Sequence, residues 1–257
     1  LATLPVWTGA GFGGVKTGRG IALGDGTARF AVYLAGLRED GLDVVFTVDA
    51  TGSMDWVLDE VKDRIEDIAQ IVRSLVPIAR FGFVAYRDRD DPEFTTRIQP
   101  LTFSTAKLYR FLSGLEAKGG GDWYEAIDDG LTDSIEHSGW RLGARKLIIV
   151  VGDAPMKAAQ LKRVVRIIEG FRLDGGTVSS LDVSDQANPH LLEAKVGRRV
   201  NRALYRSAPM HAFRVMGEAG GGDAATLDGE TKLTKRLITL IMGDQFANEM
   251  HALLDIL

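Results

Sequence analysis

Short runs of apolar residues alternate along this chain with segments in which apolar residues recur every three or four positions. Runs of this kind are typical of strands buried on both faces of a sheet. Segments with the three-to-four-residue period are typical of amphipathic helices. Residues 42–49 give the clearest run, because Val44, Val45, Phe46 and Val48 occupy both pleat directions. The alternation predicts an α/β fold, a doubly wound and mostly parallel sheet with helices on both faces.

The other elements follow from the same two signals. Apolar runs predict strands at Phe81–Tyr86, Phe94–Leu101 (an exposed edge strand), Arg145–Val151, Thr177–Val183 and Ala224–Leu227. Helical periodicity predicts helices at Ala28–Leu37, Met54–Val76, Ser104–Leu115, Asp122–His137, Lys157–Phe171, Ala208–Ala219 and Thr231–Leu257, the last broken at Gly243. Between Ser184 and Ser207 the pattern weakens. We interpret the basic cluster in that stretch as a solvated face; it comprises Arg198, Arg199, Arg202 and Arg206.

The beginning of the chain stands apart from this pattern. Residues 1–26 are rich in glycine, and the piece GAGFGGVKT invites comparison with a phosphate-binding loop. However, Val15 stands where the lysine of such a loop would follow the second glycine, and no good strand precedes it. We therefore expect residues 1–40 to form a glycine-rich N-terminal arm with a short helix. Residues 41–257 should form the main domain with a C-terminal helical region.

Composition excludes several classes of protein. The length of 257 residues and the hydrophobic content of 45% suit one large α/β domain. A net charge of −4 gives no reason to expect a nucleic-acid partner, and no apolar run is long enough to span a membrane. Without cysteine there are no disulfides, thiolate catalysts or Cys-zinc sites. The chain begins at Leu1, so removal of an upstream signal is compatible with it, and cytoplasmic and secreted or cell-surface locations both stay open.

The candidate chemistry begins where the central strand ends. Asp49 closes the run, and Thr51 and Ser53 follow it at two-residue steps. Open α/β sheets bind their ligands at the carboxyl ends of the strands, and these three side chains can turn hard oxygen atoms towards one point. Such donors suit Mg²⁺ or Mn²⁺. Asp and Ser before a helix are also common N-caps, so for this stretch alone a cap and an ion site both remain open.

Two further acidic loops favour the ion site. The stretch Gly119–Ile127 carries Asp122 and Glu125 after three glycines, although carboxylates in a first helical turn also complement the helix dipole. Asp153 follows another fully buried strand, so a second acid sits at a second carboxyl end. We therefore expect a metal site with six candidate ligands on three loops: Asp49, Thr51, Ser53, Asp122, Glu125 and Asp153. Either Asp122 or Glu125 could supply the middle ligand.

The three loops DATGSM, GGGDWYEA and GDAP, in this order and spacing, resemble the von Willebrand factor A (vWA) domain and its metal-ion-dependent adhesion site (MIDAS). The resemblance covers about residues 41–242 and implies a Rossmann-like fold. The Asp-x-Ser-x-Ser motif of the family falls on Asp49, Thr51 and Ser53, where threonine keeps the hydroxyl, and its later aspartate falls on Asp153. The resemblance also implies that hydroxyls ligate the ion directly while these two aspartates act partly through water.

The middle loop departs from the many members that supply a threonine. It is more similar to the integrin β type, whose Asp-x-Pro-Glu acids match Asp122 and Glu125, with Tyr124 in place of the proline. Motifs of the GGGD and GDAP kind also resemble those of bacterial members. What the resemblance implies is a non-catalytic, cation-dependent binding module for adhesion or scaffolding. A Glu or Asp of a partner protein would complete the shell of Mg²⁺ or Mn²⁺.

The main enzymatic alternative is Mg²⁺-dependent phosphoryl transfer of the haloacid dehalogenase type, with Asp49 as nucleophile. DATGS is close to one variant of that motif, but the companion loop requires an acid four residues after Asp153, where Lys157 stands. The turn after the central strand is not a dinucleotide-binding glycine fingerprint, and no GxSxG elbow of a hydrolase exists. The sequence therefore favours a binding domain.

Overall fold

The computed structural model describes residues 25–120, 125–206, 208–227 and 233–254. In this part of the chain six strands form one sheet in the order β3-β2-β1-β4-β5-β6, with helices on both faces. The predicted α/β class is confirmed. Of the predicted N-terminal arm, residues 1–40, only residues 25–40 are described, and they form a helix where the short helix was predicted. None of the described helices is long and apolar enough to cross a membrane.

The central strand of the sheet is β1, which pairs in parallel with β2 on one side and with β4 on the other. The strands are β1 (Leu42–Asp49), β2 (Ala79–Tyr86), β3 (Thr96–Thr102), β4 (Arg145–Gly152), β5 (Gly176–Asp182) and β6 (Gly221–Ala225). Of these strands β3 alone runs antiparallel to its neighbour, and its place at the end of the strand order confirms the predicted edge strand. Because the other strands are parallel, their carboxyl ends all meet at one edge of the sheet.

The helices agree with the predicted pattern except in two places. They are α1 (Asp25–Asp40), α2 (Asp55–Leu75), α3 (Thr105–Ser113), α4 (Ile127–Glu136), α5 (Ala158–Leu173), α6 (Pro189–Val196), α7 (His211–Gly220), α8 (Leu233–Met242) and α9 (Ala247–Leu254). The periodicity missed α6, because this helix buries none of its residues and so has no apolar stripe. The start of α4 is also later than predicted. Gly243, with φ of +98°, separates α8 from α9 as expected.

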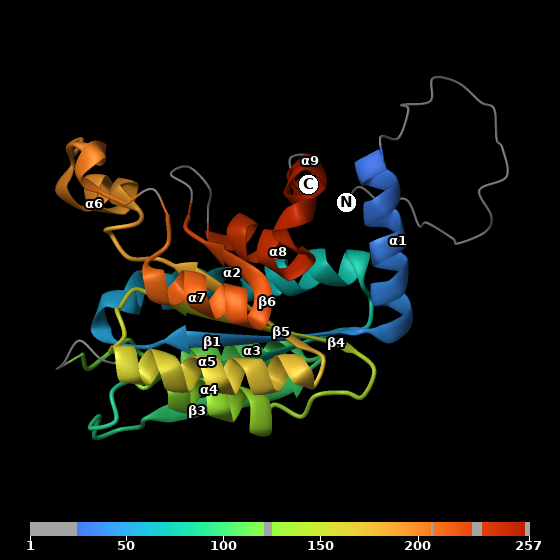
Figure 1. Ribbon diagram of the computed structural model, residues 1–257, viewed down its shortest axis with the longest axis horizontal. Helices are drawn as coiled ribbons and strands as arrows, with labels where there is room; N and C mark the ends of the chain where they lie inside the picture. The colour runs from blue at the N-terminus through green and yellow to red at the C-terminus, as the bar shows by residue number, and fades with distance from the viewer. Residues whose placement is uncertain (1–24, 121–124, 207, 228–232, 255–257) are drawn as a thin grey trace, which may run out of the picture.

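The sheet buries an apolar layer on each face. Phe46 and its neighbours Val44 and Val48 face a core formed with α1, α2, α3, α8 and α9. Val45 faces the opposite core, formed with α4, α5 and α7. Figure 1 shows α2 and α8 on one side of the sheet and α4 and α5 on the other. Burial of β1 on both faces explains why its sequence is a continuous apolar run rather than an alternating one.

A buried ion cluster closes the amino end of the sheet. Asp43 in β1 is fully buried and accepts hydrogen bonds from Arg80 Nε at 2.9 Å and from an Arg141 Nη at 2.7 Å. Burial alone would raise the pKa of Asp43, but the hydrogen bonds from both guanidinium groups outweigh it and lower that pKa. Buried acids at this end of the sheet are therefore neutralised by partners of the same chain.

Candidate metal centre

The carboxyl end of β1 is organised by a tight turn around Asp49. One carboxylate oxygen, Oδ1, accepts hydrogen bonds from the backbone N–H of Thr51 at 2.8 Å and from its hydroxyl at 2.7 Å. The side chain of Asp49 is buried, and its other oxygen, Oδ2, has no hydrogen-bond partner among the described residues. A buried carboxylate oxygen without a partner is costly and calls for a physical explanation.

The alternative that Ser53 caps the following helix is wrong. A short 3₁₀ helix, Gly52–Met54, leads into α2, and neither Thr51 nor Met54 makes a side-chain capping hydrogen bond at these helix starts. Ser53 is exposed, and its hydroxyl instead donates to the carboxylate of Asp153. The turn therefore connects the first predicted loop with the third.

Glu125 provides a second buried carboxylate at this edge. It lies in the loop before α4 rather than within the helix as predicted, and its side chain is buried. Its oxygen Oε2 also has no hydrogen-bond partner among the described residues. Asp88, the second residue after β2, interacts with Glu125 and adds to the rise in the pKa of Glu125. Acids from three strand ends and from this loop thus face one another.

A small cavity is lined by two of these acids, Asp49 and Glu125. Asp49, Glu125 and Tyr86 line it together with apolar side chains that include Met156 and Phe213. Its volume is about 10 Å³, which corresponds to roughly one water-sized occupant. The two carboxylate oxygens without partners belong to residues that line this space. The other predicted ligands among the described residues, Thr51, Ser53 and Asp153, do not line this cavity.

The electrostatics of the site reflect crowded acids. Burial raises the pKa of Asp49 to about 7, and the nearby charges of Asp153 and Asp88 add to the rise against the hydrogen bonds from Thr51. Burial, followed by the charge of Asp49, raises the pKa of Glu125 to about 10. Burial also raises the pKa of Asp153. A bound cation would reverse these shifts, because opposite charge favours the ionised carboxylates.

The second predicted loop approaches the first from the side. The N–H of Lys118 donates to the carbonyl of Ala50 at 3.1 Å. A Cβ on Gly120 would lie 3.7 Å from Cβ of Thr51, and both Gly119 and Gly120 have positive φ, at +82° and +89°. This close passage of two backbones explains the glycines of the motif. Asp122, the other candidate for the middle ligand, lies outside the described residues and stays a prediction.

Sequence reasoning missed two side chains of the centre, Asp88 and Tyr86. Both lie at the carboxyl end of β2, a strand adjacent to β1, Tyr86 as its last residue and Asp88 in the charged loop that follows. The order of the strands in the sheet is the information that would have placed these residues beside Asp49. The Tyr86 hydroxyl would lie 3.0 Å from a Cβ on Gly152, so that glycine leaves room for the ring. Among the described residues no three His, Asp or Glu side chains form a metal cluster by themselves, and the proposed donors include hydroxyls.

A second turn of the same kind ends β5 and provides a contrast. The N–H and hydroxyl of Ser184 donate to Asp182 Oδ1 at 3.0 and 2.5 Å, as Thr51 does to Asp49. Here, however, the other oxygen Oδ2 accepts from the N–H of Met210 at 2.8 Å and from the guanidinium of Arg206 at 3.4 Å. Asp182 is thus satisfied by its own chain, whereas Asp49 has one oxygen to spare.

Only part of the basic cluster is a solvated face as we interpreted it. Arg202 pairs with Glu193 at 2.7 Å, and Arg206 reaches the buried turn at the end of β5. Arg198 and Arg199 are exposed, in agreement with the interpretation. Figure 1 shows α6, which precedes these residues, standing away from the body of the domain.

The mostly parallel α/β sheet defines a class of Rossmann-like interaction domains, and comparison with known proteins supports that class. The family model of the von Willebrand factor A domain matches residues 43–228. The chain therefore belongs to the von Willebrand factor A domain family. Domains of this family are generally non-catalytic and commonly mediate protein–protein interaction.

Two curated relatives share part of the sequence. The chain is 32% identical over 117 residues to the alpha-protein kinase vwkA of Dictyostelium discoideum. This alignment covers 44% of this chain and 18% of that protein. It is 34% identical over 85 residues to a putative ariadne-like RING finger protein, R811, of Acanthamoeba polyphaga mimivirus, which covers 33% of this chain and 8% of that protein. The chain thus matches less than a fifth of the length of either relative.

Solved structures agree on the fold. The SpRpn10 VWA domain aligns with a TM-score of 0.53 and 12% identity, over 77% of this chain and 94% of that one. The BatB protein of Bacteroides thetaiotaomicron aligns with a TM-score of 0.52 and 16% identity, over 82% of this chain and 100% of that one. The pilus adhesin SpaC of Lactobacillus rhamnosus GG aligns with a TM-score of 0.52 and 10% identity, over 81% and 30%. At these identities the likeness concerns the fold alone.

Proposed function

We propose that this chain is a divalent-cation-dependent protein-binding domain with a metal-ion-dependent adhesion site at the carboxyl edge of its sheet. The ion is Mg²⁺ or Mn²⁺, and an acidic residue of the partner protein completes its shell. The ligands are Asp49, Thr51, Ser53, Asp153 and an acid of the middle loop, either Glu125 or Asp122. The middle loop belongs to the GGGD variant that resembles bacterial members.

One observation carries the proposal: two buried carboxylate oxygens without partners belong to residues that line the same cavity. These are Oδ2 of Asp49 and Oε2 of Glu125. At the opposite edge the buried Asp43 is neutralised by two arginines, and at the end of β5 the equivalent turn is satisfied by Arg206 and a backbone N–H. The Asp49 turn is built in the same way, but its Oδ2 has no partner among the described residues, which supports a cation at this position.

Each residue has a role that fits its position. Thr51 and Ser53 present hydroxyls, of which Ser53 is exposed and close to the carboxylate of Asp153. Asp49 and Asp153 supply negative charge from the ends of two adjacent strands, β1 and β4. A hard cation bound to such oxygens would supply an oriented positive site for a carboxylate. The exposed side of Ser53 is where a partner residue would approach.

Metal binding is tested by titrating Mg²⁺ into the chain by isothermal calorimetry. The wild type should bind, Asp49→Asn should not, and Asp182→Asn should bind as the wild type does. Asp182 is the matched control because it forms the same turn at the end of another strand of the same sheet. Equal binding by the wild type and Asp49→Asn would refute the assignment of the ion to this turn.

Partner binding is tested with the immobilised chain and an extract of its native source. A specific partner should be captured in Mg²⁺, released by EDTA and recovered when Mg²⁺ is returned, and Asp49→Asn should capture none. Phosphate-ester hydrolysis provides the opposing assay. Magnesium-dependent turnover that Asp49→Asn abolishes would replace the binding function with phosphoryl transfer.

A further inference from the structure

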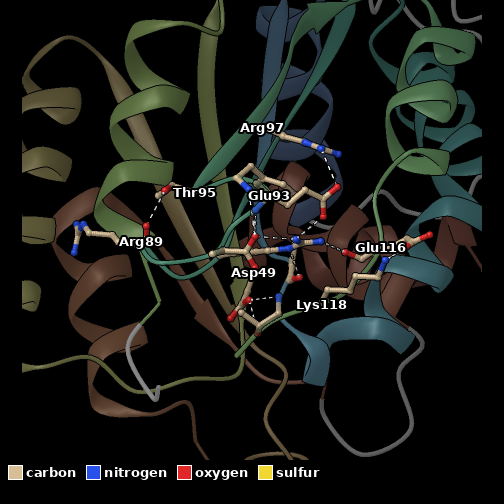
Figure 2. A network of polar contacts seen from close by, with 12 residues as sticks. Asp49, Arg89, Glu93, Thr95, Arg97, Glu116 and Lys118 are labelled. Carbon is tan, nitrogen blue, oxygen red and sulfur yellow. Dashed lines mark hydrogen bonds and ion pairs between the residues drawn. The ribbon is translucent and has the colours of Figure 1, made fainter. Parts of the chain in front are cut away.

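Arg87, the first residue after β2, is an arginine with an exposed fraction of only 1%. Its guanidinium donates in three directions. Nε reaches the carbonyl of Ala50 at 3.2 Å, one Nη reaches the carbonyl of Glu116 at 2.5 Å, and the other lies 2.9 Å from Glu93 Oε2. Figure 2 shows the surrounding polar network, in which Asp49, Glu93, Glu116 and Lys118 lie together. A buried arginine of this kind is held by geometry as well as by charge.

The groups that Arg87 contacts belong to the loops of the metal centre. Ala50 lies between Asp49 and Thr51, so Nε of Arg87 is bonded to the backbone of the first metal loop. The same carbonyl accepts the N–H of Lys118, the residue just before the glycines of the second loop. The carbonyl of Arg87 itself accepts the N–H of Ala126, next to Glu125. One residue is thus bonded to three segments that carry or flank proposed ligands.

The carboxylate partners of Arg87 continue the same arrangement. Asp91 Oδ1 lies 3.2 Å from the guanidinium and also accepts the N–H groups of Glu93 and Phe94. Its other oxygen lies 2.7 Å from where a Cβ on Gly119 would stand, so the second loop passes directly over this pair. The ring of Phe94 covers the guanidinium with its centroid 4.1 Å away. The acidic loop after β2 therefore fixes the guanidinium plane.

Only an arginine fits these acceptors. Its five donors form a planar fork that serves several separated acceptors at once, whereas lysine presents its donors from a single atom. A lysine at this position keeps the positive charge beside Asp91 and Glu93 but cannot also bond the carbonyls of Ala50 and Glu116. The substitution Arg87→Lys therefore keeps the charge of this side chain while removing its contacts with the loop carbonyls.

We propose that Arg87 is a positioning residue of the metal centre, holding the first metal loop at Ala50 against the segment that leads into the second loop at Glu116–Lys118. The link to metal affinity rests on the proposed function. The holding of the loops does not. Groups that orient ligands in this way typically contribute about 10- to 100-fold to metal affinity.

The test compares Arg87→Lys with Arg80→Lys. Arg80 is a matched control because it stands at the opposite end of β2 and also pairs with a buried aspartate, Asp43. We expect Arg87→Lys to raise the Kd for Mg²⁺ at least about tenfold in calorimetry, and Arg80→Lys to leave it unchanged. Wild-type affinity in Arg87→Lys, or an equal loss in both variants, would overturn the assignment.

Amide hydrogen exchange in EDTA gives a second readout that needs no metal. Arg87→Lys should speed exchange at Lys118 and in residues 50–54, while the amides of β1 stay protected as in the wild type. Unchanged exchange at these loops would overturn the positioning role, even if no Mg²⁺ binding were found. Faster exchange at the loops of a chain that binds no Mg²⁺ would uphold the positioning role and reject the metal function, so the two failures are distinguishable.

Discussion

Replacing Asp49 by Asn should make the metal-free protein more stable and remove the stabilisation that Mg²⁺ gives to the wild type. Asparagine has the same shape and keeps an oxygen for the N–H and hydroxyl of Thr51, but it carries no charge. In the metal-free chain, burial and neighbouring acids raise the pKa of Asp49 from its ordinary value of 3.8 to about 7. The variant removes the cost of ionising this carboxyl.

The magnitude follows from that difference in pKa. The folded chain holds the Asp49 proton more tightly than the unfolded chain, so its stability falls as the pH rises from 3.8 to about 7 and is then level. At about 1.4 kcal/mol for each pH step of one, the cost reaches about 4 kcal/mol at pH 8. In EDTA at pH 8, Asp49→Asn should therefore be more stable than the wild type by up to about 4 kcal/mol. Near pH 4 the two should be nearly equal.

Added Mg²⁺ should act in the opposite direction. At a free concentration one hundred times its Kd, a ligand that binds only the folded state adds about 2.7 kcal/mol. The wild type should gain this amount and the variant none. Urea denaturation in EDTA and in Mg²⁺, at pH 8 and near pH 4, measures all of these differences. A variant that is less stable than the wild type in EDTA at pH 8, and that gains as much from Mg²⁺, would refute the reasoning.

Three further predictions concern the frame around the centre. Asp43→Ala should destabilise the fold by about 3–5 kcal/mol, because it leaves Arg80 and Arg141 without their carboxylate partner. Since the pKa of Asp43 is lowered in the folded state, its contribution to stability is present above pH 4 and is lost as the pH falls through the folded pKa. Urea unfolding at a series of acidic pH values measures this loss. Gly152→Ala should weaken Mg²⁺ binding and lower the stability of the fold by about 1–3 kcal/mol, because the new Cβ would lie 3.0 Å from the Tyr86 hydroxyl and 3.6 Å from Cβ of Asp49. Wild-type Mg²⁺ affinity of this variant in calorimetry would contradict the packing argument. Gly170→Ala in α5, where nothing lies within 4 Å, should instead raise stability by about 0.5–1 kcal/mol in thermal unfolding, and a loss would show that the site is less open than it is in the structure.

Several features of the fold were readable from the sequence. The strand at Leu42–Asp49 is buried on both faces, so its side chains had to be apolar in both pleat directions, and this leaves a continuous run in the sequence. The helix over Asp55–Leu75 buries one face only, and its apolar period survives. Helix α6 escaped detection for the same reason, since a helix that buries nothing carries no period.

The candidate site was readable in part. Asp49 ends one buried strand and Asp153 follows another, and the carboxyl ends of parallel strands meet at one edge, so local pattern placed both acids at that edge. Local pattern did not determine which hydroxyl caps a helix and which one lies beside an acid. Thr51 stands at the start of the 3₁₀ helix, yet its hydroxyl donates to Asp49 Oδ1 and makes no capping hydrogen bond.

Only the tertiary structure decided the rest, because the decisive contacts join residues far apart in sequence. Arg87 and Asp88 belong to the centre since β2 lies beside β1, a fact of strand order that no local period encodes. The contrast between Asp49 and Asp182 is also invisible in the sequence, where both are an acid followed two residues later by a hydroxyl. The fold brings Arg206 to one of these acids and surrounds the other with further acids. Local sequence thus determined the turns and the strands, while the charge that each turn meets was set by long-range packing.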